Sequence, residues 1–239
     1  KTGKFRIAVP KFSRIANFDD LDPLKIEPGV ELVLVHPGIP IPNDVDLILL
    51  PGTKSTIAEL EMIRCEGWDI DIKAHVRQGK PVLGICGGYQ LLGNFITDPE
   101  GIEGRAGTFK ALGLLDVDTV LQGEKTVTPV DAVHWPSQTP MSGYQIHLGQ
   151  TTGPDTANSF STVNGEGEGA VSASGTVMGT YIHGAFSGDE FRRSYLSQIG
   201  VPGSAGLKYR DSLESTLNEL AEHLENTVKI DELLAIAEL

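Results

Sequence analysis

Short apolar runs alternate with segments of helical periodicity through the first half of the chain. The apolar runs predict buried strands at residues 5–9, 30–35, 45–50 and 82–85. A loop with a short helix is expected over residues 14–24. Longer helices are predicted from Ser55 or Thr56, either of which can cap a helix, to Arg64, and over residues 68–78. Such alternation predicts an α/β fold with an open, mostly parallel sheet and helices on both faces.

The pattern changes after Leu92, where turns and shorter extended segments replace the regular alternation. We expect a turn at 98–101, extended segments at 114–121, 126–133 and 143–148, an acidic turn-rich loop at 164–169, a final strand pair at 170–172 and 177–182, and a helix at 189–199. The last of these strands ends at His183, so this histidine is predicted to lie at a strand end.

The C-terminal region has a pattern of its own. Leucines recur at helical spacing and predict an amphipathic helical hairpin: Leu213, Leu217, Leu220, Leu224, then Leu233, Leu234 and Ile236. Residues 200–206, just before this hairpin, contain glycine and proline and are predicted to form a linker. We therefore predict two parts, a domain over residues 1–203 and a helical extension over residues 204–239, packed on or beside the domain.

Charge and cysteine content restrict the classes of partner. The formal net charge of −13 disfavours nucleic acid and anionic membranes. The 239 residues include only two cysteines, Cys65 and Cys86, with no secretory or membrane-spanning pattern. This favours a reducing cytoplasm, where a lone cysteine often serves chemistry. Because the chain begins at Lys1 without an initiator methionine, we expect it to be a piece of a longer polypeptide.

The stretch around Cys86 carries the clearest chemical signal. The predicted strand at 82–85 leads into Gly84-Ile85-Cys86-Gly87-Gly88, which has the spacing G-x-C-x-G, and a helix follows to Gly93. A strand, a glycine-flanked nucleophile and a helix form a nucleophile elbow, whose tight turn requires glycine on both sides. The following helix N-terminus favours the reactive thiolate. Cys65, in a predicted helix, is interpreted as a packing residue or as a cysteine without a chemical role.

A thiol nucleophile needs a base, and imidazole is the usual one. Of six histidines, His36 and His75 are set aside because they fall at a strand end and inside a helix, and His134 cannot be placed. His183 is favoured, because the carboxyl ends of parallel strands converge on one crevice where it can meet Cys86. The role of His147 remains open between a catalytic base and a structural residue, and the structural role is the more common one for such a histidine.

Acyl chemistry also needs an oxyanion hole. The N–H of Gly87, directly after the nucleophile, is one expected donor, and the strand-end loop at Gly52 is the expected source of the other. The same loop, residues 52–56, superficially suggests a phosphate loop. It lacks a glycine directly before Lys54 and another glycine five residues before that position, so a nucleotide site is rejected here.

With these residues assembled, the chain resembles class I glutamine amidotransferases in the nucleophile motif at 84–93. More narrowly, it resembles the glutaminase domains of the cobyric acid synthases, the CobQ-type enzymes of cobalamin biosynthesis. The narrower resemblance rests on residues 15–24, 50–56, 98–103, 113–115, 143–149 and 179–184, and the two together span nearly the whole chain. It implies a flavodoxin-like amidotransferase fold for the domain.

The resemblance also implies a reaction. Cys86 would attack the side-chain amide of glutamine, with His183 as base and then acid, through a thioester that water hydrolyses. Gly52 and Gly87 would hold the oxyanion, and Gln90 and Tyr144 would bind the substrate. Ammonia would pass to an N-terminal synthetase domain that uses ATP and Mg²⁺ to amidate adenosylcobyrinic acid a,c-diamide. No cofactor or metal is expected in this chain itself.

One departure from the wider class concerns the third catalytic group. Many class I relatives carry Glu two residues after the catalytic histidine, where this chain has Ala185. We therefore expect a Cys–His dyad without an essential carboxylate. Asp189 and Glu190 are the nearest candidates in sequence, and we assign them to the N-terminus of a helix.

Other readings of the motifs stay open. The chain can be the glutaminase part of a sister system, such as cobyrinic acid diamide synthase or the cell-wall amidating pair, which differ in the acceptor. A non-catalytic interaction module with the same fold is the alternative of a different class, and Cys86, His183 and Gln90 together argue against it. An α/β-hydrolase is disfavoured, because its nucleophile is typically serine.

Overall fold

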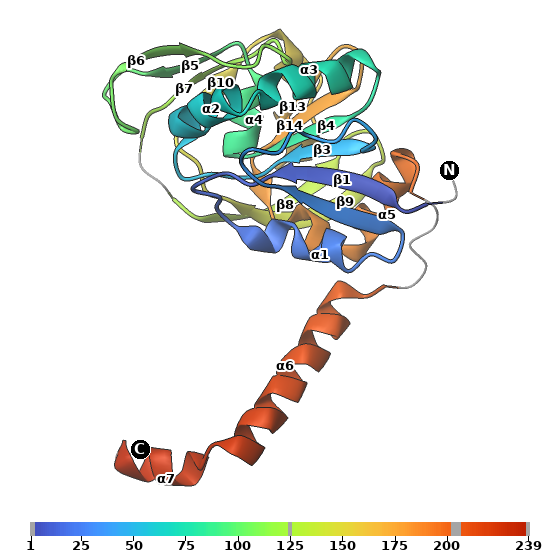
Figure 1. Cartoon of the computed structure of the whole chain (residues 1–239), viewed down its shortest axis with the longest axis vertical. Coiled ribbons are helices and arrows are strands. Elements are labelled where there is room, and N and C mark those ends of the chain that lie inside the picture. Colours follow the sequence, from blue (N-terminus) through green and yellow to red (C-terminus); the bar gives the residue numbers. More distant parts are fainter. Residues whose placement is uncertain (1–2, 124–125, 202–206, 238–239) are drawn as a thin grey trace. The chain divides into compact units, whose positions relative to one another are not determined.

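The computed structural model describes residues 3–123, 126–201 and 207–237. The chain divides into two compact units, Lys1–Ala205 and Gly206–Leu239. The first unit contains the sheets and most of the helices, and the second contains two helices (Figure 1).

The central sheet of the first unit has six strands in the order β13-β14-β4-β3-β1-β2. Their bounds are β1 Phe5–Pro10, β2 Val30–Val35, β3 Leu47–Leu50, β4 Val82–Ile85, β13 Ala170–Val171 and β14 Val177–Thr180. All neighbours pair in parallel except β13 and β14. The predicted mostly parallel sheet is confirmed, because strands buried on both faces have the continuous apolar sequences seen in β3 and β4.

Helices cover both faces of this sheet. Figure 1 shows α2 (Thr56–Cys65) and α3 (Trp68–Arg77) on one side and α1 (Asp22–Lys25) on the other. A short helix, α4 (Gly87–Leu92), leaves β4 directly, and α5 (Asp189–Gln198) follows the last strand. The helices predicted near 55–64, 68–78 and 189–199 are therefore confirmed within a residue or so at each end.

Two smaller sheets occupy the region where the sequence pattern changes. One has the order β10-β7-β5-β6, and the other has the order β12-β11-β8-β9-β15. Their strands are β5 Phe95–Asp98, β6 Gly107–Lys110, β7 Asp118–Val120, β8 Thr128–His134, β9 Thr139–Gln145, β10 Gln150–Thr152, β11 Ser161–Val163, β12 Glu166–Glu168 and β15 Ile182–His183.

Several boundaries in this region were wrong. The predicted acidic loop at 164–169 contains β12, because Glu168 is buried and accepts hydrogen bonds from Ser161 Oγ and Thr180 Oγ1 at 2.7 and 2.8 Å. The predicted strand at 143–148 ends at Gln145. The strand expected to end at His183 breaks at Tyr181, so β14 stays in the central sheet and β15 pairs with β9. This break carries His183 from the central sheet to the smaller one.

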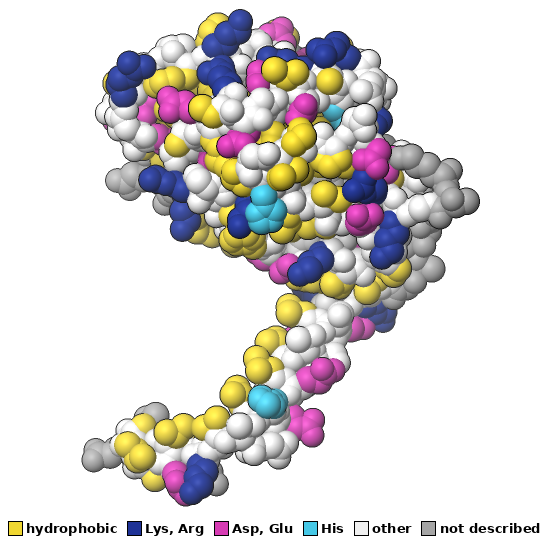
Figure 2. Space-filling view, viewed as in Figure 1, with side chains coloured by type: hydrophobic (Ala, Val, Ile, Leu, Met, Phe, Trp, Pro, Cys, Tyr) yellow, Lys and Arg dark blue, Asp and Glu magenta, His cyan; other side chains and the backbone are white. Residues whose placement is uncertain are grey.

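The second unit consists of α6 (Tyr209–Thr227) and α7 (Ile230–Ile236). The predicted helices are confirmed. Their apolar stripe lies at the surface, with Leu213, Leu217, Leu220 and Leu224 all exposed, and Figure 2 shows hydrophobic side chains in a line along one face of α6. Among the described helices, none combines the length and the apolar character needed to cross a membrane.

Candidate active site

Cys86 lies in the sharp turn between β4 and α4. Its backbone angles, φ 52° and ψ −110°, are strained for a residue other than glycine. A Cβ on Gly84 would lie 2.5 Å from the carbonyl oxygen of Gly88, and a Cβ on Gly88 would collide with the carbonyl oxygen of Leu50. Both flanking glycines are therefore required by close backbone approach, as the elbow predicts.

His183, at the end of β15, has a buried carboxylate partner. Its Nδ1 lies 2.6 Å from Oδ2 of Asp20, and the other oxygen of Asp20 accepts the N–H of Gly184 at 2.6 Å. Asp20 is only 2% exposed. The sequence predicts a dyad without an essential carboxylate. The structure places a carboxylate against His183 that comes from the N-terminal region rather than from the residues after the histidine, and the Asp20→Asn variant tests whether it is essential.

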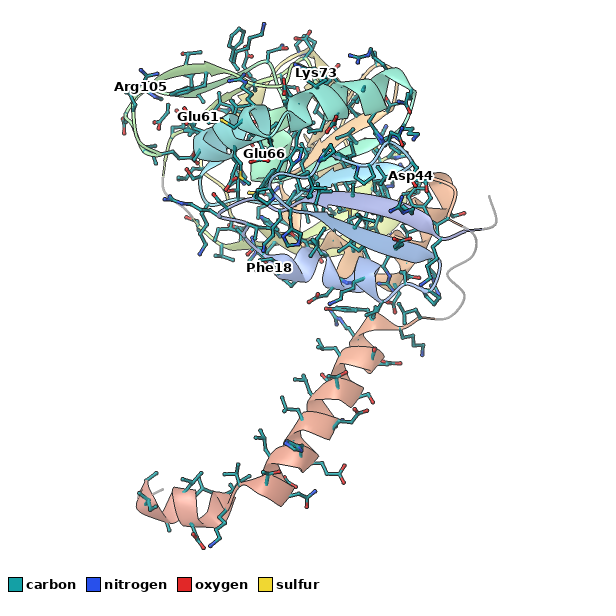
Figure 3. All side chains as sticks on the ribbon, in the orientation of Figure 1. Phe18, Asp44, Glu61, Glu66, Lys73 and Arg105 are labelled. Carbon is teal, nitrogen blue, oxygen red and sulfur yellow. The ribbon has the colours of Figure 1, made fainter. Side chains whose placement is uncertain are left out.

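The 3-10 helix Phe18–Asp20 brings Asp20 to the imidazole. Asn17, just before it, has a left-handed backbone with φ 54°, and its Nδ2 lies 3.2 and 3.1 Å from the two ring nitrogens of His183. The side chain of Phe18 is exposed at the surface of the unit (Figure 3). The loop before this helix is tied to the Gly52 loop, because the N–H of Ala16 donates to the carbonyl of Gly52 at 2.9 Å.

The environment of His183 favours its protonated form. Burial alone would lower the pKa of its imidazole, but hydrogen bonds to Asp20 and Cys86 and the charges of both outweigh burial and raise that pKa to about 10. The contribution of Cys86 to this pKa indicates that its side chain lies near the imidazole. A protonated imidazole beside the sulfur of Cys86 is an arrangement that activates cysteine nucleophiles.

Tyr144, in β9, stacks on the ring of His183. The ring centroids are 5.4 Å apart with an interplanar angle of 21°, and the Tyr144 hydroxyl donates to Oδ2 of Asp19 at 3.5 Å. Burial first, and then the charges of Asp19 and Asp20, raise the pKa of Tyr144 to about 12. Tyr144 thus packs against the imidazole, and its predicted contact with substrate stays a prediction.

The two backbone segments expected to form the oxyanion hole adjoin one another. A Cβ on Gly87 would lie 3.2 Å from the backbone nitrogen of Thr53 and 2.6 Å from its Cγ2. A Cβ on Gly52 would lie 2.8 Å from Cε1 of His183. Only glycine leaves room for these approaches, so the Gly52 loop, Gly87 and the imidazole surround one point beside Cys86.

Gln90 is buried one helical turn beyond Cys86. Its Oε1 accepts the hydroxyl of Thr56 at 2.9 Å, and its Nε2 donates to the carbonyl of Leu148 at 2.9 Å and to the hydroxyl of Tyr181 at 3.2 Å. These bonds fix its amide at the cavity that Cys86 lines.

That cavity has a volume of about 20 Å³, which is room for about one water molecule. The segment from Ile146 to Leu148 covers it, and the thiol of Cys86 donates to the carbonyl of Ile146 at 3.6 Å. His147, in the same segment, stacks on Tyr181 with centroids 3.8 Å apart. A cavity of this size does not hold glutamine, so its walls must move apart for glutamine to reach Cys86.

The remaining buried histidines belong to the core. His134 packs edge-on against Phe160 and Phe191, and burial lowers its pKa to about 4. His75 bonds the carbonyl of Pro81 through Nε2, and its pKa is likewise lowered to about 4, chiefly by burial. In the described part of the chain, no three His, Cys, Asp or Glu side chains gather in a group that can hold a metal ion.

Sequence reasoning missed Asp20 and Asn17. Both lie in residues 15–24, a stretch that carried the family resemblance but received no chemical role. Their spacing to His183 in the chain is far too long for any local pattern to reveal. The available signal was the aspartate directly before Leu21, in the segment that follows the first strand.

The fold is shared with solved structures of other proteins. One is the structure of PurLQS from Thermotoga maritima, with a TM-score of 0.57 and 23% identity over 90% of this chain and 99% of that one. A second, described as a glutamine amidotransferase, has a TM-score of 0.56 and 15% identity over 82% of this chain and 99% of that one. The chain belongs to the family of CobB/CobQ-like glutamine amidotransferase domains, which it matches over residues 6–191.

The chain matches curated proteins at higher sequence identity than it matches the solved structures. The chain is 52% identical to the cobyric acid synthase of Jannaschia sp. (strain CCS1) over 226 residues, 95% of this chain and 47% of that protein. It is 50% identical to the cobyric acid synthase of Bradyrhizobium diazoefficiens over 237 residues, 99% of this chain and 49% of that protein. The chain therefore spans about half the length of the curated relatives that it matches.

Proposed function

We propose that this chain hydrolyses glutamine to glutamate and ammonia through a thioester on Cys86. The observation that supports this most directly is the strained, glycine-flanked turn at Cys86 together with a buried His183 whose Nδ1 is paired with the carboxylate of Asp20. The pair reacts as a thiolate and an imidazolium, with the proton of the Cys86 thiol held by His183. The thiolate attacks the amide carbon, the carbon–nitrogen bond breaks, and the imidazolium gives that proton to the leaving nitrogen.

The second half of the cycle regenerates the site. Neutral His183 then takes a proton from water, the resulting hydroxide attacks the thioester, and the carbon–sulfur bond breaks to release glutamate. Because the raised pKa of His183 keeps its ring protonated at the start, the histidine acts first as acid and then as base. Asp20 stabilises the imidazolium and fixes the ring, as a positioning residue.

The surrounding groups have supporting roles in this proposal. The backbone N–H groups at Gly87 and in the Gly52 loop stabilise the oxyanion of each tetrahedral intermediate. Gln90 binds the substrate once its bond to the carbonyl of Leu148 is released, and Tyr144 contacts substrate from its place on His183.

The identity to the two cobyric acid synthases supports a place in cobalamin biosynthesis. We infer that ammonia from this domain serves an N-terminal synthetase domain, which binds ATP and Mg²⁺ and amidates adenosylcobyrinic acid a,c-diamide. Two free cysteines, exposed Cys65 and buried Cys86, support a reducing, cytoplasmic setting. The sister amidating systems remain the alternative for the acceptor.

Glutamate release by the purified chain tests the proposal. Cys86→Ala is expected to abolish hydrolysis, and Cys86→Ser to leave only a trace, because a hydroxyl is a far weaker nucleophile here. Cys65→Ala, which removes the exposed thiol, serves as the matched control and keeps the full rate. Near-normal turnover by Cys86→Ala would favour the non-catalytic interaction module instead.

A further inference from the structure

Glu59, in the first turn of α2, is a fully buried carboxylate that the proposed chemistry does not use. Burying a carboxylate is costly unless hydrogen bonds replace the water that it loses. Its Oε1 accepts the N–H of Arg14 and the hydroxyl of Ser13, each at 2.8 Å, and its Oε2 accepts the N–H of Ser13 at 3.2 Å. These donors lie 45 and 46 positions earlier in the chain, so the carboxylate joins two distant segments.

The segment that the carboxylate holds, residues 13–16, follows β1 and contains no regular helix or strand. An isolated bridge pairs Ile15 with Thr53, and the carbonyl of Arg14 accepts the N–H of Lys54 at 3.0 Å. An irregular segment depends on such individual bonds, because it lacks the repeated backbone pairing of a helix or a sheet. Residues 13–16 are therefore bound through the carboxylate to α2 and through their own backbone to the loop that follows β3.

This segment leads directly into the groups that contact the imidazole of His183. Asn17 comes next, with its left-handed φ of 54° and its Nδ2 at 3.2 and 3.1 Å from the two ring nitrogens. Asp20 follows, with Oδ2 at 2.6 Å from Nδ1. A left-handed residue other than glycine persists where the surrounding structure fixes the backbone. The anchoring of the segment before Asn17 therefore bears directly on the partners of the histidine.

We propose that Glu59 is a positioning residue for the catalytic histidine. By fixing residues 13–16, it holds Asn17 and Asp20 against the imidazole. This inference rests on the proposed glutaminase function, in which the histidine carries the proton between steps. The side-chain hydrogen bonds of Glu59 go to the segment, so the carboxylate acts through the segment and not on the substrate.

Glu59→Gln is the primary test, because it keeps the length of the side chain but turns one oxygen into an NH₂ group that cannot accept from Ser13 or Arg14. A shift of about 1 Å at a catalytic group lowers rates by up to about a hundredfold, so kcat is expected to fall about tenfold to a hundredfold. The KM for glutamine should change by less than about threefold, because the lost arrangement serves the chemical steps.

The matched control is Glu61→Gln, which makes the same charge change at an exposed position of the same helix (Figure 3). It should leave both constants unchanged. Rates are referred to the concentration of folded protein, measured by circular dichroism. An unchanged kcat of Glu59→Gln on that basis would show a role in stability alone and would overturn the inference.

A double-mutant cycle with Asp20→Asn shows whether Glu59 acts through the partners of the histidine. If it does, Glu59→Gln lowers kcat much less in the Asp20→Asn background than in the wild type, because the group that it positions is already lost. Losses that simply multiply belong to two independent sites, and that outcome contradicts the proposed role.

The protonation of His183 gives a readout that needs no turnover. In long-range ¹H–¹⁵N spectra, Glu59→Gln should lower the pKa of this ring from its wild-type value of about 10, because a displaced Asp20 supports the imidazolium less well. Glu61→Gln should leave the pKa unchanged. If the pKa falls in this way but the wild type never releases glutamate, the hydrolytic function fails while the positioning role stands. A wild-type pKa in Glu59→Gln overturns the inference.

Ser13→Ala decides the matter if Glu59→Gln does not fold. It removes only the hydroxyl donor to the carboxylate and leaves both backbone N–H groups in place. The loss of one hydrogen bond to a charged group should lower kcat by about threefold to tenfold, with a smaller fall in the pKa of His183. Wild-type values of both quantities in folded Ser13→Ala overturn the inference.

Discussion

Replacing Asp20 with asparagine tests how the site holds its histidine. Both carboxylate oxygens of Asp20 are engaged at 2.6 Å, one with Nδ1 of His183 and one with the N–H of Gly184. Asparagine keeps the size of the side chain, but one of its two terminal groups is NH₂. That group then faces either Nδ1–H of His183 or the N–H of Gly184, and two donors cannot form a hydrogen bond with each other. The substitution also removes the negative charge from a buried place, so the imidazolium loses its partner.

The magnitude follows from the pKa of His183. A rise from 6.5 to about 10 corresponds to roughly 5 kcal/mol in favour of the protonated ring, and Asp20 supplies a large part of it against the opposing effect of burial. Without Asp20, burial pulls the pKa down and the ring is neutral near pH 7. The leaving nitrogen then lacks a proton donor, and kcat should fall roughly a hundredfold to a thousandfold.

Two assays measure this. Glutamate release gives kcat for the wild type, Asp20→Asn and the control Asp19→Asn, which alters an exposed aspartate in the same 3-10 helix and should stay within about threefold of wild type. Long-range ¹H–¹⁵N spectra, assigned with His183→Gln, report the protonation of the ring. The reasoning is refuted if Asp20→Asn keeps its kcat, or if His183 stays protonated at neutral pH in that variant.

Three further predictions concern stability and ligands. The pKa of His183 is raised from the ordinary imidazole value of 6.5 to about 10 in the fold, so its stabilising contribution is complete below about pH 6.5 and is lost as pH rises toward 10. Urea titrations over this range should show a steeper decline in stability for wild type than for Asp20→Asn. Arg192→Met leaves Glu27 without the fully buried partner that it has at 2.6 Å, and the free energy of unfolding should fall by about 3–5 kcal/mol, whereas Arg193→Met, one residue on and exposed, should change it little. Calorimetry with Mg-ATP should detect no micromolar binding to these 239 residues, since the 52–56 loop lacks the phosphate-loop pattern; tight binding would contradict the division of labour between this domain and a synthetase.

Local patterns predicted the tight turn around Cys86 well. The turn at Cys86 depends on residues within a few positions of it, and both flanking glycines are explained by backbone atoms that approach them. The alternation of strands and helices likewise predicted the parallel sheet, because continuous apolar strands such as β3 and β4 are typical of strands buried on both faces.

Local sequence patterns did not predict contacts between residues that lie far apart in the chain. Asp20 reaches His183 across 163 positions of chain, and the break at Tyr181 that moves the histidine into the second sheet depends on pairing between β15 and β9. Short strands such as β12 form because Glu168 is hydrogen-bonded in the interior, although its surrounding glycines and acidic residues predict a loop. Hydrophobic periodicity does not encode these partners.

Covalent labelling of Cys86 tests the central claim most directly. The glutamine analogue 6-diazo-5-oxo-L-norleucine forms a stable bond to a thiol that attacks at the position of the glutamine amide. Peptide mapping by mass spectrometry should locate one adduct on Cys86, suppressed by excess glutamine, and none on Cys65, which is exposed and serves as the internal control. Labelling of Cys65 alone, or of Cys86 without protection by glutamine, would contradict the proposal that Cys86 attacks glutamine.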